Sequence, residues 1–175
     1  GAEADRLKRV TGVSKAVPDL SFSTELTLHL GNREVLFWHR PGPTAGSMWV
    51  ILPEAEIAFL GDTVTVSEPP YVGEADLESW LDSLDELRSK AFSSFLLISG
   101  RDGIVEREAV TEMARFLRKV QLRLKRLGSK PESAARVAKG LIRSYRIPST
   151  RRDQVLLRLQ SGLRGLHARL HASRA

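Results

Sequence analysis

The chain has 175 residues, of which 42% are apolar and 27% charged, as in a soluble globular domain with a real core. It contains no cysteine, which excludes disulfides, thiolate zinc sites and cysteine nucleophiles. No apolar run is long enough to span a membrane and the charged start does not resemble a signal peptide, so we expect a cytoplasmic protein.

The net charge of +6 is unevenly distributed along the chain. Residues 1–100 carry a net charge of −7, whereas residues 101–175 carry +13. Such a split predicts either two regions with different surroundings or two surfaces that attract each other. We therefore expect a strand-rich region over residues 1–108 and a basic helical extension over residues 109–175 that packs on it.

The first part of the chain has the pattern of consecutive strands. A short helical tendency over residues 3–14 ends before Pro18, because proline disfavours helix at the preceding residue. From residue 24 apolar and polar residues alternate, and a Gly31-Asn32 turn separates two such runs. Further apolar runs follow over residues 47–53 and 56–66. The pattern predicts four strands between residues 24 and 66.

The second part is helical. Residues 74–92 have an amphipathic helical pattern, and residues 93–100 are typical of a short buried strand. A long helix is predicted from residue 107 to Gly128, which is a plausible stop signal. Two more helices are predicted over residues 131–146 and 150–172.

Three segments, in this order, carry a family resemblance: PGPTAGSMWVILPEAEIAFLGD, EPPYVGEADLESWLDSLDEL and FLLISGRDGIVEREAV. Between about residues 18 and 103 the chain resembles the C-terminal half of a metallo-β-lactamase-fold hydrolase. That pattern has a strand pair, Pro-Gly-His-Thr-x-Gly-Ser, Gly-Asp, a proline-containing loop, a helix, a strand and Gly-His-Gly. The resemblance implies an α/β fold: half of an αββα sandwich, with a mixed sheet, covering helices and a helical C-terminal extension.

The resemblance also implies a metal site, which this sequence does not keep. In the family, imidazole and carboxylate ligands hold divalent ions that activate water. The histidine of Pro-Gly-His-Thr falls on Pro43, which has no donor atom, and that of Gly-His-Gly falls on or beside Arg101, a permanent cation. The aspartate of Gly-Asp is retained as Asp62. The family's His-x-His-x-Asp-His motif belongs to the N-terminal half, which this chain lacks.

We therefore expect no bound metal and no catalytic residue, with Asp62 capping a loop instead. The polar residues left around a vestigial pocket are Thr44, Ser47, Asp62, Arg101 and Asp102.

The four histidines do not supply a replacement site. His29 and His39 are single strand residues without a metal-ligand partner at a suitable spacing. His167 and His171 are four residues apart on a helix, which lets two imidazoles share an ion, but arginines surround them. We expect a frayed basic helix end, where histidine suits the helix dipole.

Half of a sandwich leaves one face of its sheet uncovered. We expect the helices over residues 75–90 and 106–127 to cover one face. A large exposed apolar face marks an interaction surface. The sequence therefore predicts a homodimer that packs sheet to sheet, or a different chain that supplies the missing half. The residues expected on the uncovered face are Leu26, Leu28, Leu36, Trp49 and Ile51.

Residues 109–175 contain 17 Lys and Arg against 3 Asp and Glu. Such helices can bind nucleic acid through phosphates, with Arg151 and Arg152 as candidate anion-binding residues. Aromatic residues for stacking are scarce, and no nucleic-acid-binding signature is present. The alternative is a solvated surface that docks against the acidic helix of residues 73–87, and attachment to anionic membranes is a weaker option.

The sequence thus favours a non-catalytic, metal-free scaffold or interaction protein. One alternative is half of a metal-dependent hydrolase, with zinc as its cofactor, whose histidine-rich motif comes from another chain or from a missing N-terminal region. The other is a basic nucleic-acid-binding regulator.

Overall fold

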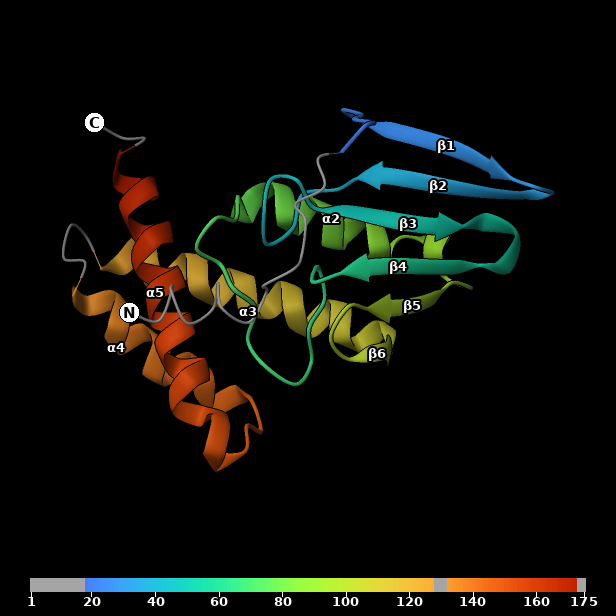
Figure 1. Ribbon diagram of the computed structural model, residues 1–175. Coiled ribbons are helices and arrows are strands. Elements are labelled where there is room, and N and C mark those ends of the chain that lie inside the picture. The colour runs from blue at the N-terminus through green and yellow to red at the C-terminus, as the bar shows by residue number, and fades with distance from the viewer. Residues whose placement is uncertain (1–17, 128–131, 173–175) are drawn as a thin grey trace, which may run out of the picture.

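One mixed sheet organises the chain, which a computed structural model describes over residues 18–127 and 132–172. Its six strands follow one another in chain order, and neighbours are antiparallel except for the parallel pair β4 and β5 (Figure 1). The strands are β1 (Glu25–Leu30), β2 (Arg33–His39), β3 (Met48–Leu52), β4 (Ile57–Gly61), β5 (Leu96–Ser99) and β6 (Gly103–Val105).

Four helices accompany the sheet: α2 (Leu77–Arg88), α3 (Arg107–Arg126), α4 (Glu132–Leu141) and α5 (Ser149–Ala172). Short 3-10 turns lie at Pro53–Ala55, Lys90–Phe92 and Ile142–Ser144. Asp76 begins α2 as its N-cap, because its carboxylate accepts hydrogen bonds from the backbone N–H groups of Glu78 and Ser79. None of the described helices combines the length and the apolar character that crossing a bilayer requires.

The predicted elements are confirmed, with one strand missed. The four strands between residues 24 and 66, the strand before residue 100 and the four helices occur where the pattern places them. The missed strand β6 has only three residues and begins at Gly103, whose φ of +72° suits the turn that reverses the chain after β5. The helical tendency over residues 3–14 lies outside the described residues.

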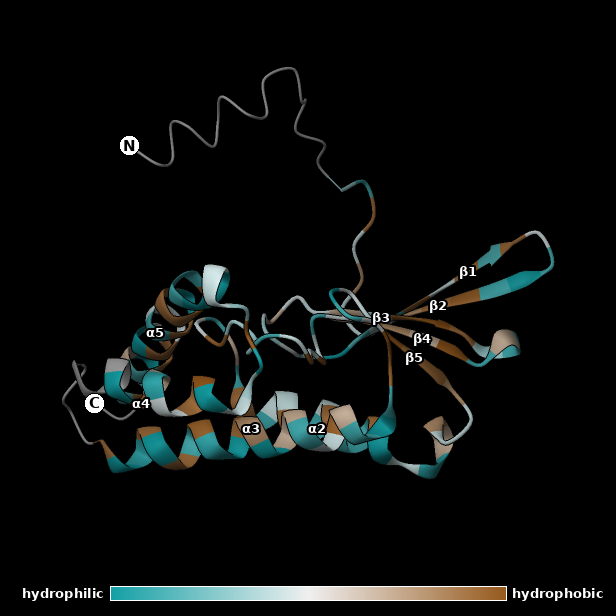
Figure 2. Cartoon of the chain, turned by 90° about the horizontal axis from the view of Figure 1, so that it is seen from below, coloured by the Kyte–Doolittle hydropathy of each residue, from teal (hydrophilic) through white to brown (hydrophobic). Residues whose placement is uncertain are grey.

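Helices α2 and α3 lie together on one side of the sheet, which we call the covered face (Figure 2). Its strands contribute the buried side chains of Trp49, Ile51 and Leu97, which join the same core as Trp80 of α2 and Leu117 of α3. Burial of side chains of this size stabilises the fold by about 1.5–3 kcal/mol each. The core therefore lies between the sheet and these two helices.

The opposite side of the sheet, the open face, is covered by no helix or strand of the described residues (Figure 2). The register aligns one apolar residue from each strand across it: Leu26, Phe37, Val50, Phe59, Ile98 and Ile104. Phe59 in the middle of the sheet remains 39% exposed and Ile104 at its edge 64%. An apolar row thus crosses the whole sheet on its uncovered side.

The sequence-based assignment of residues to this face was partly wrong. Leu26 pairs with Phe37 and lies on the open face, as does Leu28 two residues on. Leu36, Trp49 and Ile51 lie on the covered face, where Leu36 pairs with Ile51. Strand β3 reads MWVIL, so both of its faces are apolar and alternation alone does not tell which one the helices cover.

The C-terminal helix α5 shares the core of the sheet and its helices. Leu159, Leu163 and Leu166 are buried and belong to the same apolar cluster as Trp49. Close packing continues along α5, since a Cβ on Gly162 would lie 3.2 Å from the backbone nitrogen of Gly73.

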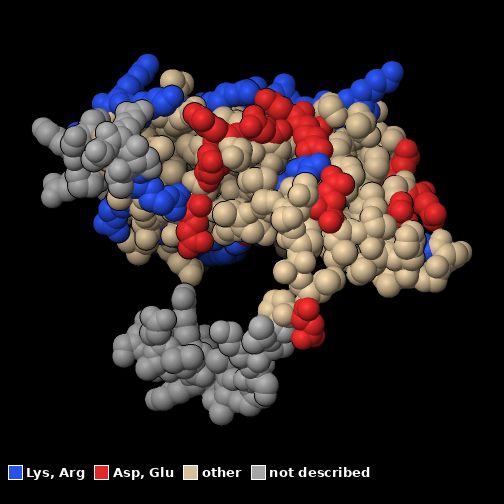
Figure 3. Space-filling model, turned by 90° about the horizontal axis from the view of Figure 1, so that it is seen from above, with Lys and Arg blue, Asp and Glu red and all other residues tan. Residues whose placement is uncertain are grey.

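The surface charge is distributed by side, with Lys and Arg along the side on which α2 and α3 lie and a band of Asp and Glu next to them (Figure 3).

Candidate functional site

Three loops converge where β4 and β5 end. The backbone N–H of Gly100 donates to the carbonyl of Gly61 at 2.7 Å, which joins the loops after these two strands. The loop between β2 and β3 reaches the same place, because a Cβ on Gly42 would lie 3.1 Å from the Thr63 hydroxyl. Two buried tryptophans fix Thr63: the indole N–H of Trp49 donates to its Oγ1 and that of Trp80 to its carbonyl.

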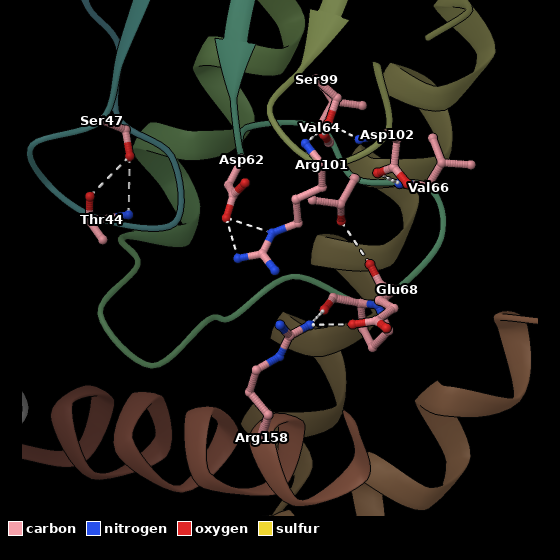
Figure 4. Close-up of polar contacts among 12 residues, drawn as sticks. Thr44, Ser47, Asp62, Val64, Val66, Glu68, Ser99, Arg101, Asp102 and Arg158 are labelled. Atoms are coloured by element: carbon pink, nitrogen blue, oxygen red, sulfur yellow. Dashed lines mark hydrogen bonds and ion pairs between the residues drawn. The ribbon is translucent and has the colours of Figure 1, made fainter. Parts of the chain in front are cut away.

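The retained aspartate is in contact with an arginine. Arg101 donates from Nε and from Nη2 to the same oxygen, Oδ2 of Asp62, at 2.8 and 2.6 Å (Figure 4). The hydrogen bond to Asp62 raises the pKa of Arg101 against the opposing effect of partial burial. The Asp62 carboxylate therefore has a permanent cation beside it, and both side chains remain about 40% exposed, at 38% and 43%.

The residues present do not fit a catalytic zinc ion. Pro43 is buried and has no donor, and the Arg101 guanidinium occupies the oxygen of Asp62 that faces it. Within the described residues, no three His, Cys, Asp or Glu side chains lie close enough together to hold a metal ion. A catalytic zinc site needs three protein ligands and an open position.

The other residues of the predicted pocket point elsewhere. The hydroxyls of Thr44 and Ser47 lie 3.1 Å apart within their own exposed loop. Asp102 turns to the loop after β4 and accepts hydrogen bonds from the backbone N–H groups of Val66, at 2.8 Å, and Ser67, at 3.0 Å (Figure 4). The structure therefore joins Asp62 with Arg101 but does not gather all five residues into one site.

The pKa of Asp102 reflects this capping role. Partial burial by itself raises the pKa, but hydrogen bonds from Ser67 and Val66, together with the charge of Arg101, lower it further than burial raises it. Asp102, rather than Asp62, is thus the loop-capping aspartate of this region.

A buried carboxylate that the sequence did not single out lies next to the site. Glu68 is 8% exposed and forms ion pairs with two arginines of α5, Arg151 at 2.8 Å and Arg158 at 3.3 Å. Arg158 also donates to the carbonyl of Pro69 at 2.8 Å (Figure 4). Burial lowers the pKa of Arg158. The positive charge of Arg101 lowers it further, because the two guanidinium groups repel each other. The sequence gives no sign that residue 68 contacts residue 158. The Pro-Pro after Glu68 indicates only that this segment is a loop.

Polar contacts of α5 in the basic extension reach this loop and the residues after it. Arg169 donates to the backbone carbonyls of Gly73 and Ala75, just before α2. The acidic helix itself receives a longer contact, 3.8 Å from Arg118 to Asp85. Of the two candidate anion-binding arginines, Arg151 contacts Glu68, while Arg152 is exposed on α5.

The four histidines lie in three places, two of them side by side on α5. His29 is exposed on β1, and Nε2 of His39 donates to the carbonyl of Ala45 at 2.6 Å. His167 is 3% exposed, which corrects the expectation of a frayed helix end, and its ring centre lies 4.4 Å from that of His171. The leucines of α5 pack against the core and carry His167 inward with them.

Comparison with known proteins places these features in a family. The family model described as the metallo-beta-lactamase superfamily matches residues 3–91, about half of the chain. The chain belongs to the metallo-β-lactamase superfamily. The resemblance seen in the sequence is thereby confirmed, and so is the α/β fold with its mixed sheet. No curated protein matches the sequence significantly.

Two solved structures show the fold that this superfamily member shares. A metallo-beta-lactamase family protein from Thermus thermophilus matches with a TM-score of 0.61 and 18% identity, over 98% of this chain and 60% of that one. A metallo-beta-lactamase from Pontibacter korlensis matches with a TM-score of 0.51 and 22% identity, over 67% of this chain and 62% of that one. The chain thus spans about three fifths of the length of these relatives. The first match includes the C-terminal helices.

Proposed function

We propose that this chain is a non-catalytic, metal-free member of the metallo-β-lactamase superfamily that acts as an interaction scaffold. The observation that carries the proposal is the contact between Arg101 and Asp62. The guanidinium supplies a positive charge at the retained carboxylate, and it has no vacant coordination position. It cannot lower the pKa of a bound water as a divalent ion does, so the superfamily's source of hydroxide is missing.

Metal content tests this part of the proposal. The purified protein is loaded with zinc or manganese, dialysed and analysed for elements. We expect far less than one ion per chain, with Asp62→Asn giving the same value as wild type. A stoichiometric ion that disappears in Asp62→Asn would overturn the metal-free proposal.

The open face supports the scaffold role. Its apolar row crosses six strands, a width of roughly 24 Å at about 4.8 Å per strand. Sheets with such a face normally pack against a second layer about 10 Å away. We propose that a second copy of the chain supplies this layer, so that two open faces pack as an isologous homodimer. The support is that all six side chains of the row are apolar and none is ionisable.

Sedimentation velocity on matched variants tests the homodimer. Phe59→Glu places a charge in the middle of the row, whereas Leu157→Glu places one on an exposed leucine of α5. We expect a dimer for wild type and Leu157→Glu, and a monomer for Phe59→Glu, because a buried unpaired carboxylate is costly. A wild-type monomer at micromolar concentration would overturn the homodimer.

A second candidate follows from the length of the relatives. Because the chain spans about 60% of the Thermus thermophilus structure, the remaining part of a sandwich could come from a different polypeptide or region that carries the histidine-rich metal motif. This would make the chain one half of a metal-dependent hydrolase that uses Asp62. It requires that the completed protein bind zinc through Asp62, and that Asp62→Asn abolish both the zinc and the hydrolysis.

The basic side of the helices favours a third role, in nucleic-acid binding. Along α3, six exposed Lys and Arg side chains accompany two exposed Glu side chains, Glu108 and Glu112. A gel shift with duplex and single-stranded DNA, repeated at rising salt, tests this role, since binding by phosphate contacts weakens steeply with salt. Lys125→Ala with Arg126→Ala should abolish a specific shift, and Lys90→Ala, on the turn after α2, is the control.

A further inference from the structure

A cavity of about 640 Å³ lies beside α3, and of the five residues of the predicted vestigial pocket only Asp102 lines it. Its floor contains the buried side chains of Met113 and Phe116, together with Tyr145 from the segment between α4 and α5. The Tyr145 ring stands edge-on to Phe116, with centroids 5.7 Å apart and an interplanar angle of 85°. Ligand sites in proteins are typically concave, of this volume and largely apolar, with a few polar groups that set orientation.

Carboxylates line this cavity at the N-terminal part of α3. Asp102, Glu106, Glu108 and Glu112 line it, against two cations, Arg115 and Lys119. Arg115 forms an ion pair with Glu112 and so is already neutralised. Lys119 lies roughly 16 Å further along α3 than Glu108, at about 1.5 Å per residue, beyond the Debye length of about 10 Å at ordinary salt.

The remaining charged side chains that line this end of the cavity are negative, while the neighbouring Arg101 and Arg107 donate to Asp62 and to the backbone carbonyl of Phe92. The N-terminus of α3 adds about half a positive charge to this end, which is less than the charge of either Glu106 or Glu108. The behaviour of Tyr145 agrees with this geometry. Burial, followed by the negative charges of Asp102 and Glu112, raises the pKa of its hydroxyl, so the lining disfavours a further negative charge.

We propose that this cavity binds a small amphipathic organic cation. Its aromatic or branched aliphatic body would pack on Met113, Phe116 and Tyr145, and its ammonium group would lie at the carboxylates of Glu106 and Glu108. Aromatic faces also favour a nearby cation, which adds to this selectivity. The site needs no metal and shares only Ile104, at the edge of the sheet, with the open-face row, so it stands or falls separately from the scaffold role.

Protein NMR with phenethylammonium as the probe tests the site. In ¹⁵N-labelled protein, millimolar phenethylammonium should shift the amide signals of residues 102–119 and 144–145. The neutral analogue, phenethyl alcohol, should bind more weakly by about fivefold per missing charge contact, and the anionic analogue, hydrocinnamate, should not bind. The affinity for the cation should fall as salt rises.

Two pairs of variants locate the probe. Ala109→Trp fills the cavity from α3 and should abolish the shifts, whereas Leu122→Trp adds the same ring to an exposed position on the same helix and should not. Glu106→Gln with Glu108→Gln should weaken binding about 25-fold, since each position supplies one charge contact worth about fivefold. Glu74→Gln with Glu78→Gln, next to another cavity, is the matched control.

The proposal fails if phenethylammonium leaves the amides of this cavity unshifted. It also fails if the alcohol and the cation bind equally, because the carboxylates then select nothing. Shifts that cluster instead at residues 74–78 and 166–171 would assign the probe to the other cavity and overturn the site proposed here. If Ala109→Trp does not fold, the variant Glu106→Gln with Glu108→Gln still tests the proposal.

Discussion

Arg101 reaches back 39 positions along the chain to hold Asp62, with two of its N–H groups on a single carboxylate oxygen. By the sequence resemblance, Asp62 corresponds to a metal ligand of the family pattern and Arg101 to a position of a histidine. Because both side chains are substantially exposed, the ion pair stabilises the fold by less than about 1 kcal/mol. The ion pair matters for chemistry rather than stability, because the cation beside Asp62 is the chain's own guanidinium and not an exchangeable metal ion.

Restoring the two histidines should restore a metal site. We expect the double variant Pro43→His, Arg101→His to bind about one zinc ion per chain, because two imidazoles would then join Asp62 where the three loops converge. Isothermal titration with zinc measures this directly. The same double variant with Asp62→Asn is the control and should lose the zinc. If the double variant binds no zinc although it folds, residues 43 and 101 do not face Asp62 closely enough.

Asp102 should make the protein sensitive to acid. Its pKa in the folded state is lowered from 3.8, so the charged form stabilises the fold above that pH. This contribution is lost as the pH falls from 3.8 through the lower folded pKa. Urea unfolding at neutral pH should show Asp102→Asn to be less stable by about 1 kcal/mol.

The difference between Asp102→Asn and wild type should then shrink below pH 3.8. Asp82→Asn, on the exposed side of α2, is the control and should follow wild type at every pH. If the difference in the free energy of unfolding between Asp102→Asn and wild type stays constant at the lowest pH measured, the hydrogen bonds of Asp102 do not depend on its charge.

Glu68 should hold α5 against the loop before α2. Glu68→Gln keeps the shape but removes the charge that pairs with Arg151 and Arg158, and we expect a loss of about 2 kcal/mol in the free energy of unfolding. Arg151→Gln should cost less than about 1 kcal/mol, because Arg151 is mostly exposed. Hydrogen exchange should become faster in α5 for Glu68→Gln. Unchanged exchange there would show that the apolar contacts of α5 suffice without the ion pairs.

Neighbouring residues of β3 should respond very differently to truncation. Ile51→Ala should destabilise the protein by about 2–5 kcal/mol, because Ile51 is buried under the helices. Val50→Ala, one residue earlier on the open face, should cost about 1 kcal/mol in the monomer. Chemical unfolding at submicromolar concentration measures both. Equal losses would mean that the open face is also covered in the isolated chain.

Much of the fold could be predicted from the sequence because its signals are local. Alternation from residue 24, the Gly31-Asn32 turn and the stripe of leucines around Trp80 each depend on residues a few positions apart, and each element formed as predicted. The sequence also predicts the loss of two metal ligands, because Pro43 and Arg101 lack suitable donors whatever their surroundings. Strand β6 was missed because three residues carry too little pattern.

The sequence by itself determined the element types and the family resemblance. Tertiary structure decided which face of the sheet became the core, since β3 is apolar on both sides and only the position of α2 and α3 distinguishes them. It also decided that Asp102 caps a loop, that Glu68 binds α5 and that Tyr145 closes a cavity with Phe116. These contacts join residues tens of positions apart. Local pattern does not encode them, because they depend on how whole elements pack.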